Sequence, residues 1–302
     1  MTTFTIKVIA IISMLIDHTG AVFNLHDGFR IVGRIAFPLF VFLISEGCKH
    51  TKSYEKYLLR LGLFALISQI PFDLAFSQRW GYQIHIDFFN RTNIFYTLWL
   101  GVVCAYLFNI FRFFIREKLL LSNIPDFTSL NSLSSNSKSS NSLSSSSMSL
   151  NSMKSIFMNL TFTKIIKSFF AFILLVVLPL PAAMFAADWL DSDYGAVGVL
   201  FIFLMTLFNR PENRPESSYK NLENSSEYSK TVQLSIKLFI ITLFMFILYS
   251  QRPDMFIGSL FALPIVFFAN GQQGKPVKWL FYITYPGHLL ILTFLARLLF
   301  HP

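Results

Sequence analysis

The chain reads Met14-Leu-Ile-Asp-His-Thr-Gly-Ala-Val-Phe23 near the end of its first apolar run, residues 4–23. A helix that crosses the hydrocarbon core of a bilayer needs about 20 residues, so this run predicts a transmembrane helix. Two ionisable residues, Asp17 and His18, are adjacent within it. A carboxylate at that depth costs roughly 3 kcal/mol on insertion scales, and we therefore interpret both residues as candidates for a functional site.

Helical spacing separates these two side chains. Small and polar residues recur at steps of three and four along one face of the predicted helix: Ala10, Ser13, Asp17, Gly20 and Asn24. Such a face is typical of one that packs against other helices. Because neighbours in sequence point about 100° apart on a helix, we expect Asp17 and His18 to have separate partners on other helices.

The composition predicts an all-α, polytopic transmembrane helical bundle. The 302 residues are 54% hydrophobic and only 14% charged, whereas soluble domains carry about 25% charged residues. The two short runs, the sixth and the eighth, are the least certain spans, so we expect about 8–9 spans. Nine apolar runs are present, at residues 4–23, 31–48, 57–76, 93–115, 165–187, 194–208, 233–250, 254–270 and 278–300.

The basic residues predict the orientation. A net charge of +9 would suggest nucleic acid as a partner of a soluble protein. Here Lys and Arg concentrate in the loops after the second, fourth, sixth and eighth runs, and the positive-inside rule accounts for them. We therefore expect a cytoplasmic N-terminus and no nucleic-acid partner. The two cysteines lie in apolar runs and no metal-ligand spacing is present, so we expect no metal.

Two polar stretches divide the chain. Residues 122–155 are mostly Ser and Asn, and this composition predicts a disordered cytoplasmic linker. It separates an N-terminal block of four helices, residues 1–121, from a C-terminal block of about five helices, residues 156–302. A second polar loop is expected at residues 210–231.

The predicted orientation gathers polar residues at the outer ends of several helices. Arg34 opens the second helix, and we expect it to pair with Asp17 because the pair neutralises two costly charges at similar depth. Asp73 ends the third helix, Asn93 opens the fourth, and Asp188 lies in the loop before the sixth. For three further charges we favour the plainer interpretation that they mark the water boundary: Arg79, Asp191 and Asp193.

Two other groups each allow two interpretations. His288 lies one helical turn after Tyr285 and close to Pro286, whose missing N–H favours a kink. It is either a packed, hydrogen-bonded histidine or a member of the site. Glu46 precedes a basic segment at the cytoplasmic end of the second helix. It is either a helix-end charge or part of a basic mouth that holds the phosphates of a soluble donor.

Several long motifs resemble the TraX family. They are Lys7-Val-Ile-Ala-Ile-Ile-Ser-Met-Leu-Ile-Asp-His-Thr-Gly-Ala-Val-Phe23, Gly33-Arg-Ile-Ala-Phe-Pro-Leu-Phe-Val-Phe-Leu-Ile-Ser-Glu-Gly47, Tyr57-Leu-Leu-Arg-Leu-Gly-Leu-Phe-Ala-Leu-Ile-Ser-Gln-Ile-Pro-Phe-Asp73, Asn93-Ile-Phe-Tyr-Thr-Leu98, the Asp-Tyr-Gly turn within residues 188–198, Asn270-Gly271, and Phe281-Tyr-x-x-Tyr-Pro-x-His-Leu289. The resemblance extends over nearly the whole chain apart from the Ser-rich stretch and the 210–231 loop.

The resemblance implies a multi-pass protein of the bacterial cytoplasmic (inner) membrane. The family is named for a member that N-acetylates pilin during conjugal pilus assembly, and it is distantly similar to integral-membrane acyltransferases that use cytosolic acetyl-CoA. In those relatives a His and an Arg near the start of the chain are linked to transfer. His18 and Arg34 correspond to them by type and location. The implied acceptor is a pilin-like protein or an envelope polysaccharide.

The residues then support three hypotheses. In an acyltransferase, His18 is the general base, and Arg34, paired with Asp17, holds the site or binds the pantetheine or phosphates of the donor. Tyr285 or His288 donates to the oxyanion. The predicted substrate-binding residues are Asp73, Asn93, Asp188, Tyr285 and Glu46. The alternative is a membrane carrier or exporter of a small polar or lipid-linked solute, in which Asp17, Asp73 and Asp188 couple to protons. A non-catalytic scaffold for envelope assembly is the third.

Overall fold

The computed structural model describes residues 1–51, 53–76, 86–122, 169–170, 172–208, 223–275 and 279–300. Within these ranges all regular secondary structure is helical, as the composition predicts. Almost all of the predicted linker 122–155, and most of the predicted loop 210–231, lie outside the described residues. The described part of that loop is helical from Glu223 onward, because the helix of the seventh run extends N-terminally beyond its apolar part.

Six segments of the described residues are long and apolar enough to cross a membrane. The protein is therefore a multi-pass helical membrane protein. The six segments are α1 (Thr3–Val22), α2 with α3 (Gly28–Gly33 and Ala36–His50), α4 (Tyr54–Phe76), the first part of α5 (Ile94–Ser122), most of α10 (Glu223–Leu248) and most of α13 (Trp279–Phe300).

The two apolar runs that are shortest in the sequence form shorter helices. The sixth run is α9 (Gly195–Leu207), and the eighth is α11 (Pro253–Leu260) followed by α12 (Ala262–Phe267). The fifth run lies partly outside the described residues. The total number of spans and the orientation in the membrane therefore stay predictions.

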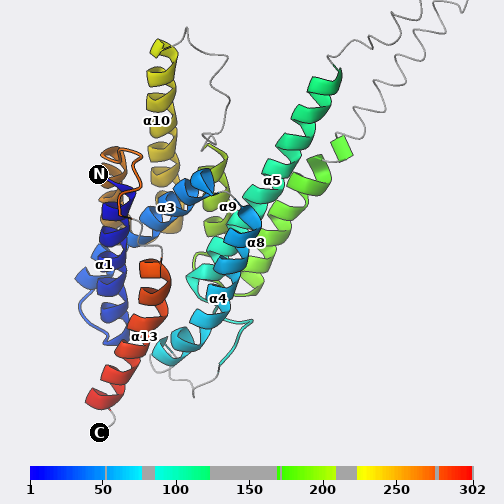
Figure 1. Ribbon diagram of the computed structural model, residues 1–302. Helices are drawn as coiled ribbons and strands as arrows, with labels where there is room; N and C mark the ends of the chain where they lie inside the picture. Colours follow the sequence, from blue (N-terminus) through cyan, green and yellow to red (C-terminus); the bar gives the residue numbers. More distant parts are fainter. Residues whose placement is uncertain are drawn as a thin grey trace, which may run out of the picture. The chain divides into compact units, whose positions relative to one another are not determined.

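The chain forms two compact units. One comprises residues 1–105 and 182–302, and the other residues 106–181. The second contains the later part of α5, the π-helix η1 (Ile173–Val177) and the start of α8 (Pro179–Trp189). In the first unit, α1 packs against α2, α3 and α13, and α13 packs against α4 (Figure 1). The division into blocks at the linker, which the sequence predicts, stays a prediction.

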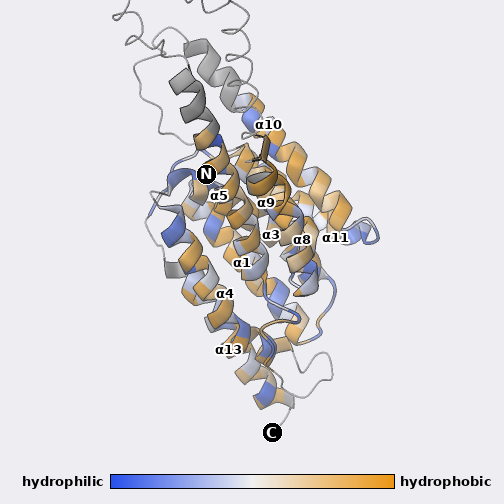
Figure 2. Ribbon diagram, turned by 90° about the vertical axis from the view of Figure 1, so that its right-hand side faces the viewer, coloured by the Kyte–Doolittle hydropathy of each residue, from blue (hydrophilic) through white to orange (hydrophobic). Residues whose placement is uncertain are grey.

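The outer surface of the helices is apolar, as lipid contact requires. On α13, Ile283, Ile291 and Phe294 are 65%, 62% and 66% exposed, whereas Tyr285 and Leu289 on the opposite face are buried. Hydrophobic residues dominate the helix surfaces and hydrophilic residues gather in the connecting segments (Figure 2). Exposed apolar patches of this extent mark a membrane-facing surface.

A break between α2 and α3 positions Arg34. The sequence predicts one helix across this region, but α2 ends at Gly33 and α3 begins at Ala36. Gly33 lies against α1, where an added Cβ would come within 2.2 Å of the Asp17 carboxylate. The absence of a side chain at Gly33 therefore lets α1 and α2 approach closely enough for Asp17 to meet the arginines of α2 and the break.

Candidate functional site

Two cavities lie in the unit formed by residues 1–105 and 182–302. The first, here called the His18 cavity, measures about 470 Å³ and is lined by charged and aromatic residues that include Asp17, His18, Arg34, Asp193, Tyr249 and Tyr285. The second, here called the basic cavity, measures about 560 Å³ and is lined by residues that include Lys7, Glu46, His50, Lys56, Arg60 and Lys275. The two cavities therefore differ sharply in charge.

Asp17 is held by two arginines in the His18 cavity. Its Oδ1 accepts from Arg34 Nη2 at 2.5 Å and its Oδ2 accepts from Arg30 Nη1 at 3.0 Å. The Asp17 side chain is 12% exposed and that of Arg34 is 11% exposed. This confirms the predicted pairing of Asp17 with Arg34. The second partner, Arg30, was not predicted.

Arg34 has three further contacts that fix its guanidinium group. Nε donates to the carbonyl oxygen of Arg30 at 3.1 Å, and Nη1 donates to the hydroxyl of Tyr249 at 3.2 Å. The guanidinium also lies over the ring of Tyr249, 5.8 Å from its centroid. Buried charges are tolerated when they are paired and hydrogen-bonded in this way. The cluster gives the cavity a rigid, charged wall.

His18 has its own partner on α13, as the helical spacing predicts. Its Nδ1 lies 2.6 Å from Nε2 of His288, and Nδ1 of His288 lies 2.7 Å from the carbonyl oxygen of Thr284. A carbonyl oxygen only accepts, so neutral His288 carries its proton on Nδ1 and accepts at Nε2. His18 must then donate from Nδ1. This chain leaves the lone pair on Nε2 of His18, where it is able to accept a proton.

Tyr285 lies beside this histidine pair. It is 1% exposed, and its ring meets His18 edge-on at 5.9 Å and His288 at 5.6 Å between centroids. The backbone N–H of Ile94 lies near its hydroxyl oxygen, and the O–H itself donates to no group among the described residues. A buried hydroxyl of this kind is suited to bind an oxygen of a ligand. α13 continues through Pro286 without a break, which keeps Tyr285 and His288 on one helix.

Asp193 also lines the His18 cavity, although the sequence favours a water-boundary charge there. Its backbone N–H donates to the carbonyl oxygen of Thr92 at 3.1 Å, and its carbonyl oxygen accepts from the hydroxyl of Thr97. Burial raises the pKa of Asp193 to about 6, against the opposing effect of the Arg34 guanidinium. The next residue, Tyr194, has a left-handed φ of 68° and stacks on Phe37 at 3.5 Å.

The raised pKa of Asp193 predicts a specific pH dependence of stability. A carboxyl group with a pKa of about 6 when folded, and 3.8 ordinarily, binds its proton more tightly in the folded state. The stabilisation that this carboxyl group gives to the folded state is therefore fully present below pH 3.8 and is lost as the pH rises through 6. We expect the free energy of unfolding to fall by about 1 kcal/mol between pH 5 and pH 7 on account of this group.

Thermal melting of the purified protein in detergent at both pH values measures this effect. In Asp193→Asn, the part of the difference in melting temperature between pH 5 and pH 7 that comes from Asp193 should disappear. Asp191→Asn, a change at an exposed neighbouring residue, should keep the full difference. Equal pH dependence in all three proteins would contradict the assignment.

Two predicted substrate-binding residues lie in a buried polar network rather than in the lining of either cavity. Asp73 accepts from Gln69 Nε2 at 2.9 Å and from the backbone N–H of Asp87 at 3.0 Å. Asn93 donates to the carbonyl oxygen of Ala65 at 2.8 Å and to Gln69 Oε1 at 2.9 Å. These bonds connect α4 to the segment that leads into α5. The structure thus gives both residues partners within the protein.

Of the three remaining predicted binding residues, Tyr285 lines the His18 cavity and the other two lie elsewhere. Asp188 is exposed and accepts from the backbone N–H of Ala196 at 2.7 Å, in the first turn of α9. Glu46 lines the basic cavity, where its carboxylate binds Lys237 of α10 at 2.9 Å and lies 3.8 Å from Nε2 of His50. The site residues brought together in the His18 cavity are therefore Asp17, His18, Arg34 and Tyr285, with His288 behind His18.

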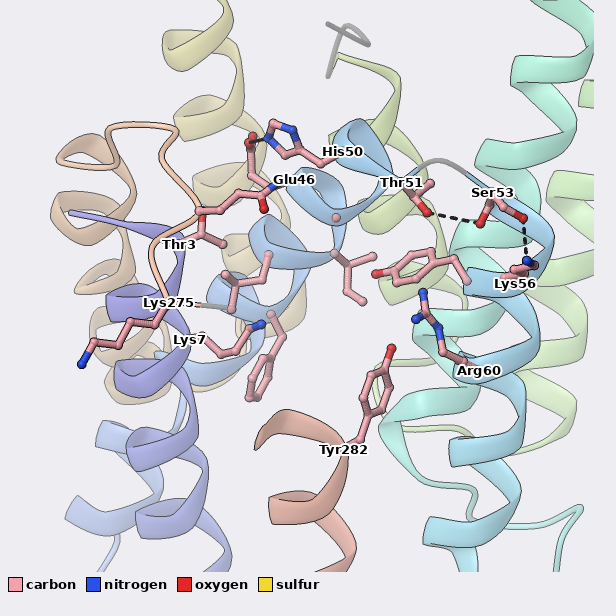
Figure 3. Close-up of a pocket in the computed structure, with 16 residues that line it drawn as sticks. Thr3, Lys7, Glu46, His50, Thr51, Ser53, Lys56, Arg60, Lys275 and Tyr282 are labelled. Carbon is pink, nitrogen blue, oxygen red and sulfur yellow. Dashed lines mark hydrogen bonds and ion pairs between the residues drawn. The ribbon is translucent and has the colours of Figure 1, made fainter. Parts of the chain in front are cut away.

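The basic cavity carries cations without matching anions. Among the described residues that line it, Glu46 is the one carboxylate, and Lys237 already binds it. Within the described part of the chain, no carboxylate forms an ion pair with any of the four cations that line this cavity: Lys7, Lys56, Arg60 and Lys275. Figure 3 shows Lys7 on α1 and Arg60 on α4 on opposite sides, with the hydroxyl of Tyr282 between them. Such a cavity attracts a multiply charged anion.

The fold and the site define a multi-pass helical membrane protein with a histidine pair and an ion-paired aspartate around a cavity. Residues 3–114 match the family model described as TraX protein. This match covers less than half of the 302 residues, and over it the chain is similar to the TraX protein family. The resembling motifs beyond residue 114 lie outside this match.

The chain is also similar to a protein that is named for fimbrial assembly. The chain is 40% identical over 110 residues to the "Probable fimbrial assembly protein FimC, serogroup H1" of Dichelobacter nodosus. The aligned part covers 33% of this chain and 43% of that relative, so the chain spans less than half of the relative's length. No solved structure matches the chain.

Proposed function

We propose that the protein is an integral-membrane acyltransferase that moves an acetyl group from acetyl-CoA to an amine or hydroxyl acceptor. The observation that carries the proposal is the chain from the Thr284 carbonyl through His288 to His18, which leaves Nε2 of His18 without a proton at the lining of a cavity. Thioester transfer requires such a base. The family match supports the same class. The name of the relative, which concerns fimbrial assembly, supports a pilin-like acceptor.

The residues of the His18 cavity can be given roles in one balanced step. His18 Nε2 takes the proton of the acceptor N–H or O–H as the acceptor atom attacks the thioester carbonyl carbon. The oxyanion that forms accepts a hydrogen bond from the hydroxyl of Tyr285, whose O–H donates to no other group among the described residues. When the carbon–sulfur bond breaks, the protonated His18 returns its proton to the leaving thiolate, giving free CoA and the acetylated acceptor.

The basic cavity is suited to the phosphates of the donor. Ammonium and guanidinium groups bind phosphate oxygens by charge and by hydrogen bonding. The four cations there lie on the side of the bundle that the basic loops assign to the cytoplasm, where acetyl-CoA is available. The acceptor would then approach the His18 cavity from the outer side of a bacterial inner membrane. A pilin-like protein or an envelope polysaccharide fits this arrangement.

A labelling experiment tests the activity. Membranes that contain the protein, and matched membranes that lack it, receive acetyl-CoA labelled in the acetyl group, and mass spectrometry follows the label. We expect covalent label on a membrane or envelope component only where the protein is present. Equal labelling in both membranes would contradict the proposal. Accumulation of an unmodified solute without covalent label would favour the carrier instead.

A further inference from the structure

The two cavities follow one another along the same three helices. On α1, Lys7 lines the basic cavity and Met14 lines the His18 cavity. On α13, Tyr282 lines the basic cavity, and Tyr285, one turn later, lines the His18 cavity. On α3, Leu43 and Ile44 line the basic cavity, and Ala36 and Phe37 line the His18 cavity. The proposed phosphate site and the proposed base therefore lie at different depths of one bundle.

Among the described residues, one side chain lines both cavities. Phe40 of α3 lies between the two sets of α3 residues and contributes to each lining, and it is only 3% exposed. The α13 tyrosines that line the two cavities are held by other rings, since Tyr282 stacks on Phe64 at 4.4 Å and Tyr285 packs edge-on against Phe95 at 5.0 Å. The phenyl ring of Phe40 is thus a thin apolar layer between two polar spaces.

We propose that Phe40 is the partition through which the acyl-thioester arm of the donor reaches His18, and that its ring limits the size of the acyl group. This inference rests on the proposed function. With the phosphates bound by Lys7 and its neighbours, the thioester must travel the roughly 15 Å that ten helical residues span on α1 to reach Asp17 and His18. The ring turns about χ1 to admit the arm and closes against larger groups.

The size limit is tested with a series of donors. Wild-type membranes, Phe40→Ala and Phe42→Ala are compared with acetyl-CoA and butyryl-CoA. Phe42 is a matched control because it lies on the same helix, is 4% exposed and lines neither of the two cavities. We expect Phe40→Ala alone to raise the ratio of butyryl to acetyl transfer by about tenfold. The same ratio in Phe40→Ala and Phe42→Ala would overturn the size limit.

The partition itself is tested without any transfer assay. In a background in which Cys48 and Cys104 are alanine, Met14→Cys places a thiol in the His18 cavity, and a membrane-impermeant maleimide is added to one side of sealed vesicles. A separate Thr51→Cys protein identifies the side on which the basic cavity opens. From that side, we expect Phe40→Ala to raise the rate of Met14→Cys modification by about tenfold, because a Phe→Ala change leaves a void where the ring was.

The two experiments separate this inference from the proposed function. Faster modification in Phe40→Ala, with no such change in Phe42→Ala, supports the partition even if no acyl transfer is found, and then the proposed function alone is wrong. An unchanged modification rate in Phe40→Ala, in membranes that do transfer acetyl groups, overturns the partition and leaves the proposed function standing.

Discussion

Replacing His18 with alanine should lower acetyl transfer by about 10²–10⁴-fold, the range that a general base contributes. The variant loses the only atom that the histidine chain leaves free to take the acceptor's proton. Its insertion should be unchanged, because the Asp17–Arg34 pair does not involve His18. Labelled acetyl-CoA measures the rate, and the amount of folded protein in the same membranes normalises it. A rate within twofold of wild type would remove His18 from the mechanism.

Variants at His288 test whether that residue positions His18. His288→Ala deprives His18 Nδ1 of its acceptor, so the ring loses its fixed tautomer and the rate should fall. His288→Gln offers a carbonyl oxygen in place of Nε2 and should restore part of the rate. A merely structural role predicts no such rescue of rate at equal amounts of folded protein. Equal losses in both variants would contradict the positioning role.

The sequence predicts the parts of this site that depend on depth and helical period. The Asp17–Arg34 pair follows from two charges at similar depth in apolar runs, and the separation of Asp17 from His18 follows from the 100° step. Both are confirmed. The His18–His288 contact joins residues 270 positions apart. The sequence near each histidine marks it as a candidate site residue, but nothing in either stretch indicates that the two side chains meet.

Other members of the site depend on tertiary packing that one sequence does not reveal. Asp193 carries the same charge as Asp191 two residues earlier, yet only Asp193 lines the His18 cavity, because hydrogen bonds to Thr92 and Thr97 hold it there. Arg30 counts in the sequence only as a loop charge. Its contact with Asp17 depends on the short helix α2, and the apolar run at residues 31–48 does not predict a separate helix there.

Asp73 is a residue that the sequence marks as a candidate for substrate binding but that the structure pairs with groups of the protein itself. A carboxylate at the end of an apolar helix has the same signature whether it binds a ligand or the backbone of the next segment. The structure shows hydrogen bonds to Gln69 and to the backbone of Asp87. Those partners depend on the conformation of the segment before α5, which composition does not define. Its predicted role in substrate binding stays a prediction.

Replacing Asp17 with asparagine should cost about 3–5 kcal/mol of folding free energy, the range for removing one partner of a buried ion pair. The substitution keeps the shape of the side chain, which Gly33 accommodates, but leaves Arg34 charged with its side chain only 11% exposed. We expect a clear fall in the melting temperature in detergent and loss of acetyl transfer. Asp27→Asn is the matched control, because Asp27 is 71% exposed and its partner Arg252 lies 3.6 Å away. That change should leave the melting temperature nearly unchanged.

The double variant Asp17→Asn with Arg34→Gln distinguishes two possible causes of the lower stability of Asp17→Asn. One is the loss of the attraction between the two charges, and the other is the buried arginine that is left unpaired. Removing both charges leaves Arg30, whose side chain is 28% exposed and is able to reach water. The double variant should therefore melt at a higher temperature than Asp17→Asn, since coupled residues are not additive. It should still lack transfer activity if the arginine holds the site during catalysis. A double variant whose melting temperature falls by the sum of the two single losses would mean that the charges act independently, and that the unpaired arginine is not what destabilises Asp17→Asn.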